Sequence, residues 1–136
     1  GLFIAHCKMK HKFNDLPIIG AHDIGYHPRF FPWHVSWNGC TGGITSVGIA
    51  SNGDILPCLS LRDKQFVEGN VKERSLVEIW NDENCFCYTR NFDVNNLGNN
   101  CRNCEFGKTC KGGCSSMSHY LSGNLHNDPF CFRRML

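Results

Sequence analysis

Four cysteines within fourteen residues constrain this chain more than any other feature of its sequence. Cys101, Cys104, Cys110 and Cys114 lie in the run CRNCEFGKTCKGGC, with the spacing CX2CX5CX3C. Thiolates this close in sequence, with glycines between them, are usually gathered round metal. The 136 residues contain ten cysteines, and the hydrophobic fraction of 41% counts them as apolar, so the remaining apolar core is thin. Metal binding is therefore expected to stabilise the fold alongside packing.

The composition also bears on the compartment and on the classes of partner. Ten cysteines could form five disulfides in an oxidising compartment, but the chain shows no signal peptide. We therefore expect a cytoplasmic protein with metal-bound cysteines, with a secreted disulfide scaffold as an alternative. No apolar stretch is long enough to span a bilayer, and a net charge of +2 is too slight to indicate nucleic-acid binding. Because the chain lacks a starting Met, we expect it to be part of a longer polypeptide.

The first 36 residues differ from the rest of the chain. Residues 2–5 form a short apolar run, typical of a strand buried in a parallel sheet. A basic stretch with Lys8, Lys10 and Lys12 follows, and then a segment interrupted by proline and glycine. We expect residues 1–36 to be the tail of a preceding domain plus a linker, and residues 37–136 to be a separate domain.

Within that second part the sequence predicts short elements. Residues 44–50 and 55–59 read as two strands of a β-hairpin, joined by turn residues 51–54. Ser75 and Glu78 form a capping box for a helix that runs to about residue 90, with residues 81–82 as the place where it would break in two. Another short helix should start near Cys114 and end at Gly123. The expected class is α+β, a small loop-rich domain with a hairpin and short helices organised round two metal clusters.

The cysteine run is too compact for a zinc ribbon, in which two short cysteine hooks are separated by a dozen or more residues. It is closer to the ferredoxin arrangement, in which three cysteines hold one cluster and the fourth reaches a second cluster. By that logic Cys114 serves another site. The hairpin brings Cys40 and Cys58 together for that other site. Cys131 is left to complete the site that holds Cys101, Cys104 and Cys110.

These residues carry a family resemblance. The pattern of Cys40, twelve residues, Gly53, four residues and Cys58, followed by the CX2CX5CX3C run and Cys131, resembles the seven-cysteine signature of the SPASM domain. That domain is the C-terminal extension of many radical S-adenosylmethionine enzymes that modify peptides and proteins. The resemblance implies two auxiliary 4Fe-4S clusters. Their ligands would be Cys40, Cys58 and Cys114 for the first, and Cys101, Cys104, Cys110 and Cys131 for the second.

The resemblance also implies a separate catalytic domain elsewhere in the polypeptide. The catalytic domain of the family binds S-adenosylmethionine and a third 4Fe-4S cluster through a CX3CX2C motif, which this chain lacks. The chain should therefore not be catalytic alone, and residues 1–36 would be the end of an upstream catalytic barrel and its linker. The implied function is electron transfer and substrate positioning in an enzyme that matures a peptide or protein, with an electron donor or acceptor protein as a further partner. For the fourth ligand of the first cluster His34, Cys7 and an open iron all remain, because residues 33–39 hold no cysteine.

Other interpretations of the cysteines remain open. The same cysteines could serve a non-catalytic zinc-binding interaction module. We interpret Cys85 and Cys87, which fall outside the signature, as small buried hydrophobic residues. No catalytic residue and no residue that binds an organic cofactor is predicted. Basic residues beside the proposed ligands would either balance cluster charge or form an ordinary solvated surface; these are Arg102, Lys108, Lys111, Arg133 and Arg134.

Overall fold

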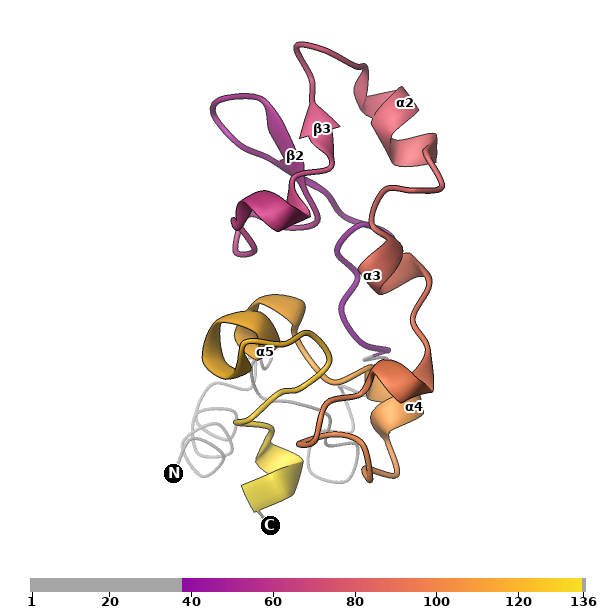
Figure 1. The fold of residues 1–136 in the computed structure, drawn as a ribbon, viewed down its shortest axis with the longest axis vertical. Coiled ribbons are helices and arrows are strands. Elements are labelled where there is room, and N and C mark those ends of the chain that lie inside the picture. Colours follow the sequence, from indigo (N-terminus) through magenta and orange to yellow (C-terminus); the bar gives the residue numbers. More distant parts are fainter. Residues whose placement is uncertain (1–37, 136) are drawn as a thin grey trace, which may run out of the picture.

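The computed structural model describes residues 38–135. The strand expected at residues 2–5, the basic stretch after it and the linker lie outside the described residues. Figure 1 shows a small sheet and helix α2 (Leu76–Asn81) at one end of the molecule, helices α4 (Gly107–Cys110) and α5 (Ser115–Ser122) with the C-terminal turn at the other, and helix α3 (Cys87–Arg90) between them. No helix among the described residues is long and apolar enough to cross a membrane.

The sheet is antiparallel and has three strands in the order β1-β2-β3, namely Gly48–Ile49, Asp54–Leu56 and Gly69–Asn70. The predicted hairpin is confirmed, with Gly48 opposite Leu56, but its strands are shorter than expected. Ile44 lies outside the first strand because its N–H donates to the carbonyl of Thr41 over 2.9 Å and closes a turn there. The third strand was not predicted.

Polar side chains secure β3 against the hairpin. The side-chain amide of Asn70 donates to the carboxylate of Asp54 over 2.9 Å and to the carbonyl of Asn52 over 3.2 Å. The turn between β1 and β2 needs a left-handed residue, which Gly53 supplies at φ 98°. Side-chain bonds therefore hold in place a strand whose own two residues have little strand propensity.

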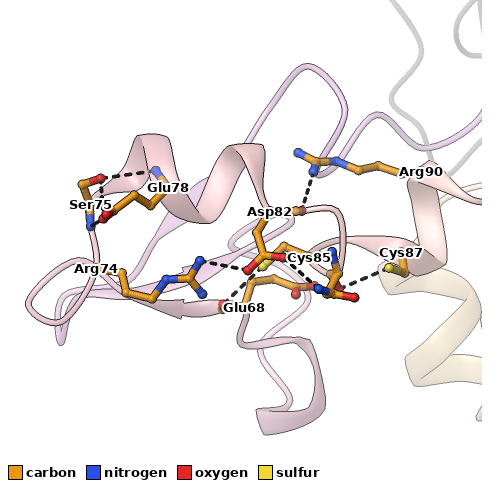
Figure 2. Close-up of polar contacts among 9 residues, drawn as sticks. Glu68, Arg74, Ser75, Glu78, Asp82, Cys85, Cys87 and Arg90 are labelled. Atoms are coloured by element: carbon orange, nitrogen blue, oxygen red, sulfur yellow. Dashed lines mark hydrogen bonds and ion pairs between the residues drawn. The ribbon is translucent and has the colours of Figure 1, made fainter.

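Helix α2 spans Leu76–Asn81 and α3 spans Cys87–Arg90, so the break predicted at residues 81–82 is confirmed. The capping box is present at the start of α2: the N–H of Glu78 donates to the hydroxyl of Ser75, and the N–H of Ser75 donates to the carboxylate of Glu78 (Figure 2). After the break, Phe86 adopts a left-handed conformation at φ 59° and turns the chain into α3.

The remaining helices are short. Helix α5 begins after Cys114 and ends at Gly123, which has φ 73°, as predicted. Helix α4 ends in a run of left-handed residues that reverses the chain before α5. Three single-turn 3-10 helices complete the described part. The elements are η3 (Lys64–Phe66), η4 (Val94–Asn96), α4 (Gly107–Cys110), α5 (Ser115–Ser122) and η5 (Phe132–Met135).

Strand β2 is buried on both faces, and each face has its own hydrophobic cluster. Ile55 packs with Ile79 and Phe86 on one side. Leu56, which points the opposite way, packs with Leu61 and Phe66 on the other. Each of these fully buried side chains contributes about 1.5–3 kcal/mol. The end of β2, where Cys58 follows, is therefore firmly placed.

Candidate metal centre

Three cysteines from distant parts of the sequence converge near the end of β2. Cys40 lies in the segment that enters the sheet, Cys58 follows β2, and Cys114 immediately precedes α5. Burial raises the pKa of the Cys58 thiol, and the nearby thiols of Cys40 and Cys114 raise it further by charge repulsion. Both partners predicted for Cys58 are therefore within electrostatic reach of it.

Backbone donors support the Cys58 sulfur. The N–H groups of Ser60 and Leu61 lie near it and oppose the rise in its pKa, and the N–H of Leu61 also donates to the carbonyl of Cys58 over 3.1 Å. Cys114 is buried, and its sulfur lies 3.2 Å from the hydroxyl of Ser116. Backbone N–H donors to a cysteine sulfur stabilise the thiolate form, which is the form that binds metal.

The other four cysteines line a single pocket near the C-terminal end of the chain. Cys101, Cys104, Cys110 and Cys131 all contribute to its wall. Glycines share this wall, so the backbone approaches the pocket closely; they are Gly107, Gly112 and Gly113. The sequence-predicted set for the second cluster is thus gathered round one space.

Successive turns produce this gathering. The N–H of Cys104 donates to the carbonyl of Cys101 over 3.0 Å, and the N–H of Gly107 donates to the carbonyl of Cys104 over 2.9 Å. Helix α4 then carries Cys110 at its end. Burial raises the pKa of Cys101 to about 11, the nearby backbone N–H of Asp128 opposes this rise, and the thiols of Cys110 and Cys131 raise the pKa further.

A short left-handed run separates the two groups of cysteines. Lys111, Gly112 and Gly113 have φ values of 55°, 78° and 85°, and Cys114 returns to extended geometry. A methyl group on Gly112 would lie 2.3 Å from the backbone of His126, so no larger residue fits there without a shift. This run takes Cys114 away from the pocket and delivers it to the start of α5.

The charged residues differ in their relation to the pocket. Arg133 and Arg134 line it, and Arg133 also pairs with Glu105 over 2.7 Å. Arg102 and Lys108 are exposed and are not part of the pocket wall, as expected for an ordinary solvated surface. The arginines at the C-terminal end are thus the cations that could balance charge in the pocket.

The two cysteines outside the signature do not join either group. The buried sulfur of Cys85 points to the backbone carbonyl of Glu68 at 3.6 Å. Cys87 is half-buried, and its sulfur lies 3.3 Å from the carbonyl of Glu83 and 3.2 Å from that of Asn84. Cys85 therefore matches its interpretation as a small buried hydrophobic residue, whereas Cys87 is more exposed than expected.

Sequence reasoning missed three residues beside these groups. Asp128 is buried and lines the pocket of the second group. The ring nitrogens of His126 lie 2.7 Å from the carbonyl of Lys111 and 3.0 Å from that of Tyr88. Tyr88 lies near the first group, within electrostatic reach of Cys40 and Cys58. Only the phrase NDPF before Cys131 carried a signal, a turn, and nothing in it indicated burial.

The arrangement of the thiols bears on what they can hold. Among residues 38–135, no three His, Cys, Asp or Glu side chains are placed so that together they could hold one metal ion. The four thiols of the second group surround a pocket instead. In a 4Fe-4S cluster each of four cysteines binds the cluster as a separate ligand, so the thiols surround the group that they hold.

Comparisons with known proteins give the family. Residues 40–105 match the model of SPASM, described as an iron-sulfur cluster-binding domain, and the match includes Cys40, Cys58, Cys101 and Cys104. The chain is 35% identical over 101 residues to the PqqA peptide cyclase of Rhizobium meliloti (strain 1021), which covers 71% of this chain and 26% of that protein. It is 34% identical over 101 residues to the PqqA peptide cyclase of Xanthomonas oryzae pv. oryzae (strain MAFF 311018), covering 69% of this chain and 26% of that protein. The chain thus spans about a quarter of the length of these relatives. By this match residues 40–105 of the chain belong to the SPASM family of iron-sulfur cluster-binding domains.

Proposed function

We propose that this chain is the auxiliary part of a radical S-adenosylmethionine enzyme that modifies a peptide, and that it holds two 4Fe-4S clusters. The observation that carries the proposal is the pocket lined by four thiols in a chain of the SPASM family. The peptide substrate is inferred from relatives that are named PqqA peptide cyclases. The proposed enzyme includes a catalytic barrel upstream, with its own cluster and S-adenosylmethionine.

The proposed ligands of the second cluster are the four cysteines of the pocket. Their donor set fits the group, because four cysteine thiolates are the usual ligands of a 4Fe-4S cluster. The backbone N–H of Asp128, which lies near the Cys101 sulfur, and the arginines at the pocket wall would offset part of the negative charge of the bound cluster. The chain thus supplies both ligands and charge compensation at this site.

The proposed ligands of the first cluster are Cys40, Cys58 and Cys114. Here the chain offers three thiols, and backbone N–H groups lie near the sulfur of Cys58 and lower its pKa. His34 and Cys7 lie outside the described residues, so we propose that the fourth iron is left open by the described part of the chain. An open iron could meet the substrate or water.

The bound clusters would supply one-electron transfer, taking an electron from the substrate or passing one on. The role of the chain is to position the clusters, bury them and set their reduction potentials through hydrogen bonds and charge. We propose residues 1–36 as the end of the barrel and the linker, and residues 37–136 as the cluster domain. The basic stretch in the first of these segments would help to hold the peptide.

The test is an anaerobic purification with iron and sulfide analysis and electron paramagnetic resonance. The wild-type chain should contain about eight iron and eight sulfide ions. Cys114→Ala should lose the signal of the first cluster and keep about half of the iron, whereas Cys104→Ala should lose the signal of the second. Cys87→Ala is the matched control, because this cysteine belongs to neither group, and it should retain both signals. A colourless protein that contains zinc and no acid-labile sulfide would overturn the proposal.

A further inference from the structure

The hydroxyl of Tyr88 is buried without a hydrogen-bond partner. Tyr88 is the second residue of α3, and its oxygen has essentially no exposed surface and no partner in hydrogen-bond geometry among the described residues. Buried hydroxyl groups in native proteins almost always have a partner, so an exception calls for a bound group that completes it. The Tyr88 hydroxyl is thus placed to meet a group that residues 38–135 do not provide.

The surroundings of Tyr88 indicate what that group is. Tyr88 and Cys58 pack against the same hydrophobic cluster of Leu56, Leu61 and Phe66. The side chain also lies within electrostatic reach of Cys40 and Cys58, two of the three thiols proposed for the first cluster. The carboxylate of Glu68 is close enough to raise the pKa of Tyr88, but the two groups do not meet the distance and angle of a normal hydrogen bond.

The hydroxyl is suited to donate rather than to bind iron as a phenolate. Burial raises the pKa of Tyr88, and the negative charges of Glu68 and of the two thiolates raise it further. Because a tyrosine hydroxyl ordinarily has a pKa of about 10, it keeps its proton at neutral pH without any such shift. The negative charge nearby favours the protonated form of the hydroxyl. It also offers an acceptor for the hydroxyl proton.

Tyr88 is also held firmly in place. The ring of Phe66 meets the tyrosine ring in an edge-to-face arrangement, with 5.2 Å between ring centroids and an angle of 73°. A ring nitrogen of His126 lies 3.0 Å from the backbone carbonyl of Tyr88. Both the ring and the backbone are therefore fixed, so the hydroxyl cannot easily turn to find another partner.

We propose that the Tyr88 hydroxyl donates a hydrogen bond to the cluster held by Cys40, Cys58 and Cys114. The inference rests on the proposed function, because it needs a cluster at that site. Hydrogen bonds to the sulfur atoms of a cluster favour the more negative, reduced state and so raise its reduction potential. Tyr88 is then a positioning and tuning residue for the first cluster, and has no such role for the second.

The test is Tyr88→Phe in the full chain, which keeps the aromatic ring against Phe66 and removes only the hydroxyl. Redox titration followed by electron paramagnetic resonance should show the first-cluster signal at a lower potential and the second-cluster signal unshifted. Iron and sulfide contents should stay at the wild-type level. In resonance Raman spectra the wild-type first cluster should respond to exchange into D2O at this bond, and the variant should lose that response.

Two control variants sharpen the test. Tyr120→Phe removes a hydroxyl that accepts from the N–H of Arg62 over 2.9 Å, and it should leave both potentials unchanged. Glu68→Gln removes the other negative group near Tyr88 and should leave the D2O response intact. If Glu68→Gln abolishes that response while Tyr88→Phe does not, the hydroxyl serves Glu68 and the proposal is wrong.

The remaining outcomes separate this inference from the proposed function. Clusters present in the wild type with no shift in Tyr88→Phe would refute the inference alone. Loss of iron from the first site in Tyr88→Phe, with the fold intact by circular dichroism, would also refute it, since Tyr88 would then be a ligand. A wild-type chain that binds no cluster at all would refute the proposed function and the inference together.

Discussion

Gly112 offers a sharp test of how the chain passes between the two cysteine groups. It has φ 78°, and the methyl group of an alanine there would lie 2.3 Å from the carbonyl carbon of His126. Gly123, at the end of α5, is a matched control with φ 73° and no atom within 4 Å of an added methyl group. The two substitutions share the backbone strain and differ only in the close approach.

The expected loss of stability follows from the backbone strain and from the close approach. Left-handed backbone costs a residue with a side chain about 1 kcal/mol, so Gly123→Ala should lower the free energy of unfolding by about that much. In Gly112→Ala the backbone of His126 must also move, which weakens two hydrogen bonds. These are from the N–H of Gly98 to the His126 carbonyl, at 3.0 Å, and from the N–H of Asp128 to the Gly112 carbonyl, at 3.3 Å. At about 1 kcal/mol for each bond, Gly112→Ala should cost about 3 kcal/mol.

Urea denaturation of the chain under reducing conditions measures both values from the transition midpoint and slope. Iron content after anaerobic purification should fall for Gly112→Ala and stay near wild type for Gly123→Ala. If the two variants unfold within about 0.5 kcal/mol of each other, the close packing of Gly112 against His126 does not matter energetically and the reasoning is refuted.

Three further predictions concern the sheet and α2. Ile55→Ala should destabilise by about 3 kcal/mol, because Ile55 is fully buried in the central strand, whereas the exposed Ile49 should tolerate the same change within about 0.5 kcal/mol; thermal denaturation compares them. Ser75→Ala should cost about 1 kcal/mol through loss of the capping box, and loss of helical signal at lower urea concentrations checks this. Hydrogen bonds from Ser75 lower the pKa of Glu78, so their stabilisation is complete above the ordinary carboxyl pKa of about 4 and is lost as pH falls through the lowered value. Denaturation midpoints measured from roughly pH 3 to 6 should therefore depend less on pH in Ser75→Ala, and an unchanged pH dependence would contradict this account.

Local signals predicted the elements that local chemistry determines. The capping box at Ser75 and the end of α5 at Gly123 each depend on a few neighbouring residues, and both are present. The hairpin was predicted for the same reason, but its strands are shorter because the turn at Thr41 removes Ile44 from the ladder. Strand β3 was missed because its pairing depends on the side chain of Asn70 reaching Asp54, sixteen residues earlier.

For the cysteines too, the sequence predicted the grouping but not the surroundings. Spacing predicted which thiols would be grouped, and four of them do line one pocket, while their role as cluster ligands stays a prediction. Nothing in the spacing indicated Tyr88, Asp128 or His126, because burial of a polar side chain depends on contacts between distant segments. The ring of His126, for example, contacts the carbonyl of Lys111 and that of Tyr88, and Tyr88 lies thirty-eight residues before His126 in the sequence.

The left-handed run between Cys110 and Cys114 is also a tether of fixed length. Four residue steps can span at most about 14 Å, whatever conformation the chain adopts. Under the proposed ligand assignment, two clusters are therefore fastened to opposite ends of one short covalent link. Under the proposed function, movements of the sheet or of an upstream domain would change how the first cluster meets its substrate without separating the two clusters. Electron transfer between the two proposed clusters would thus be insensitive to the motions that accompany substrate binding and release.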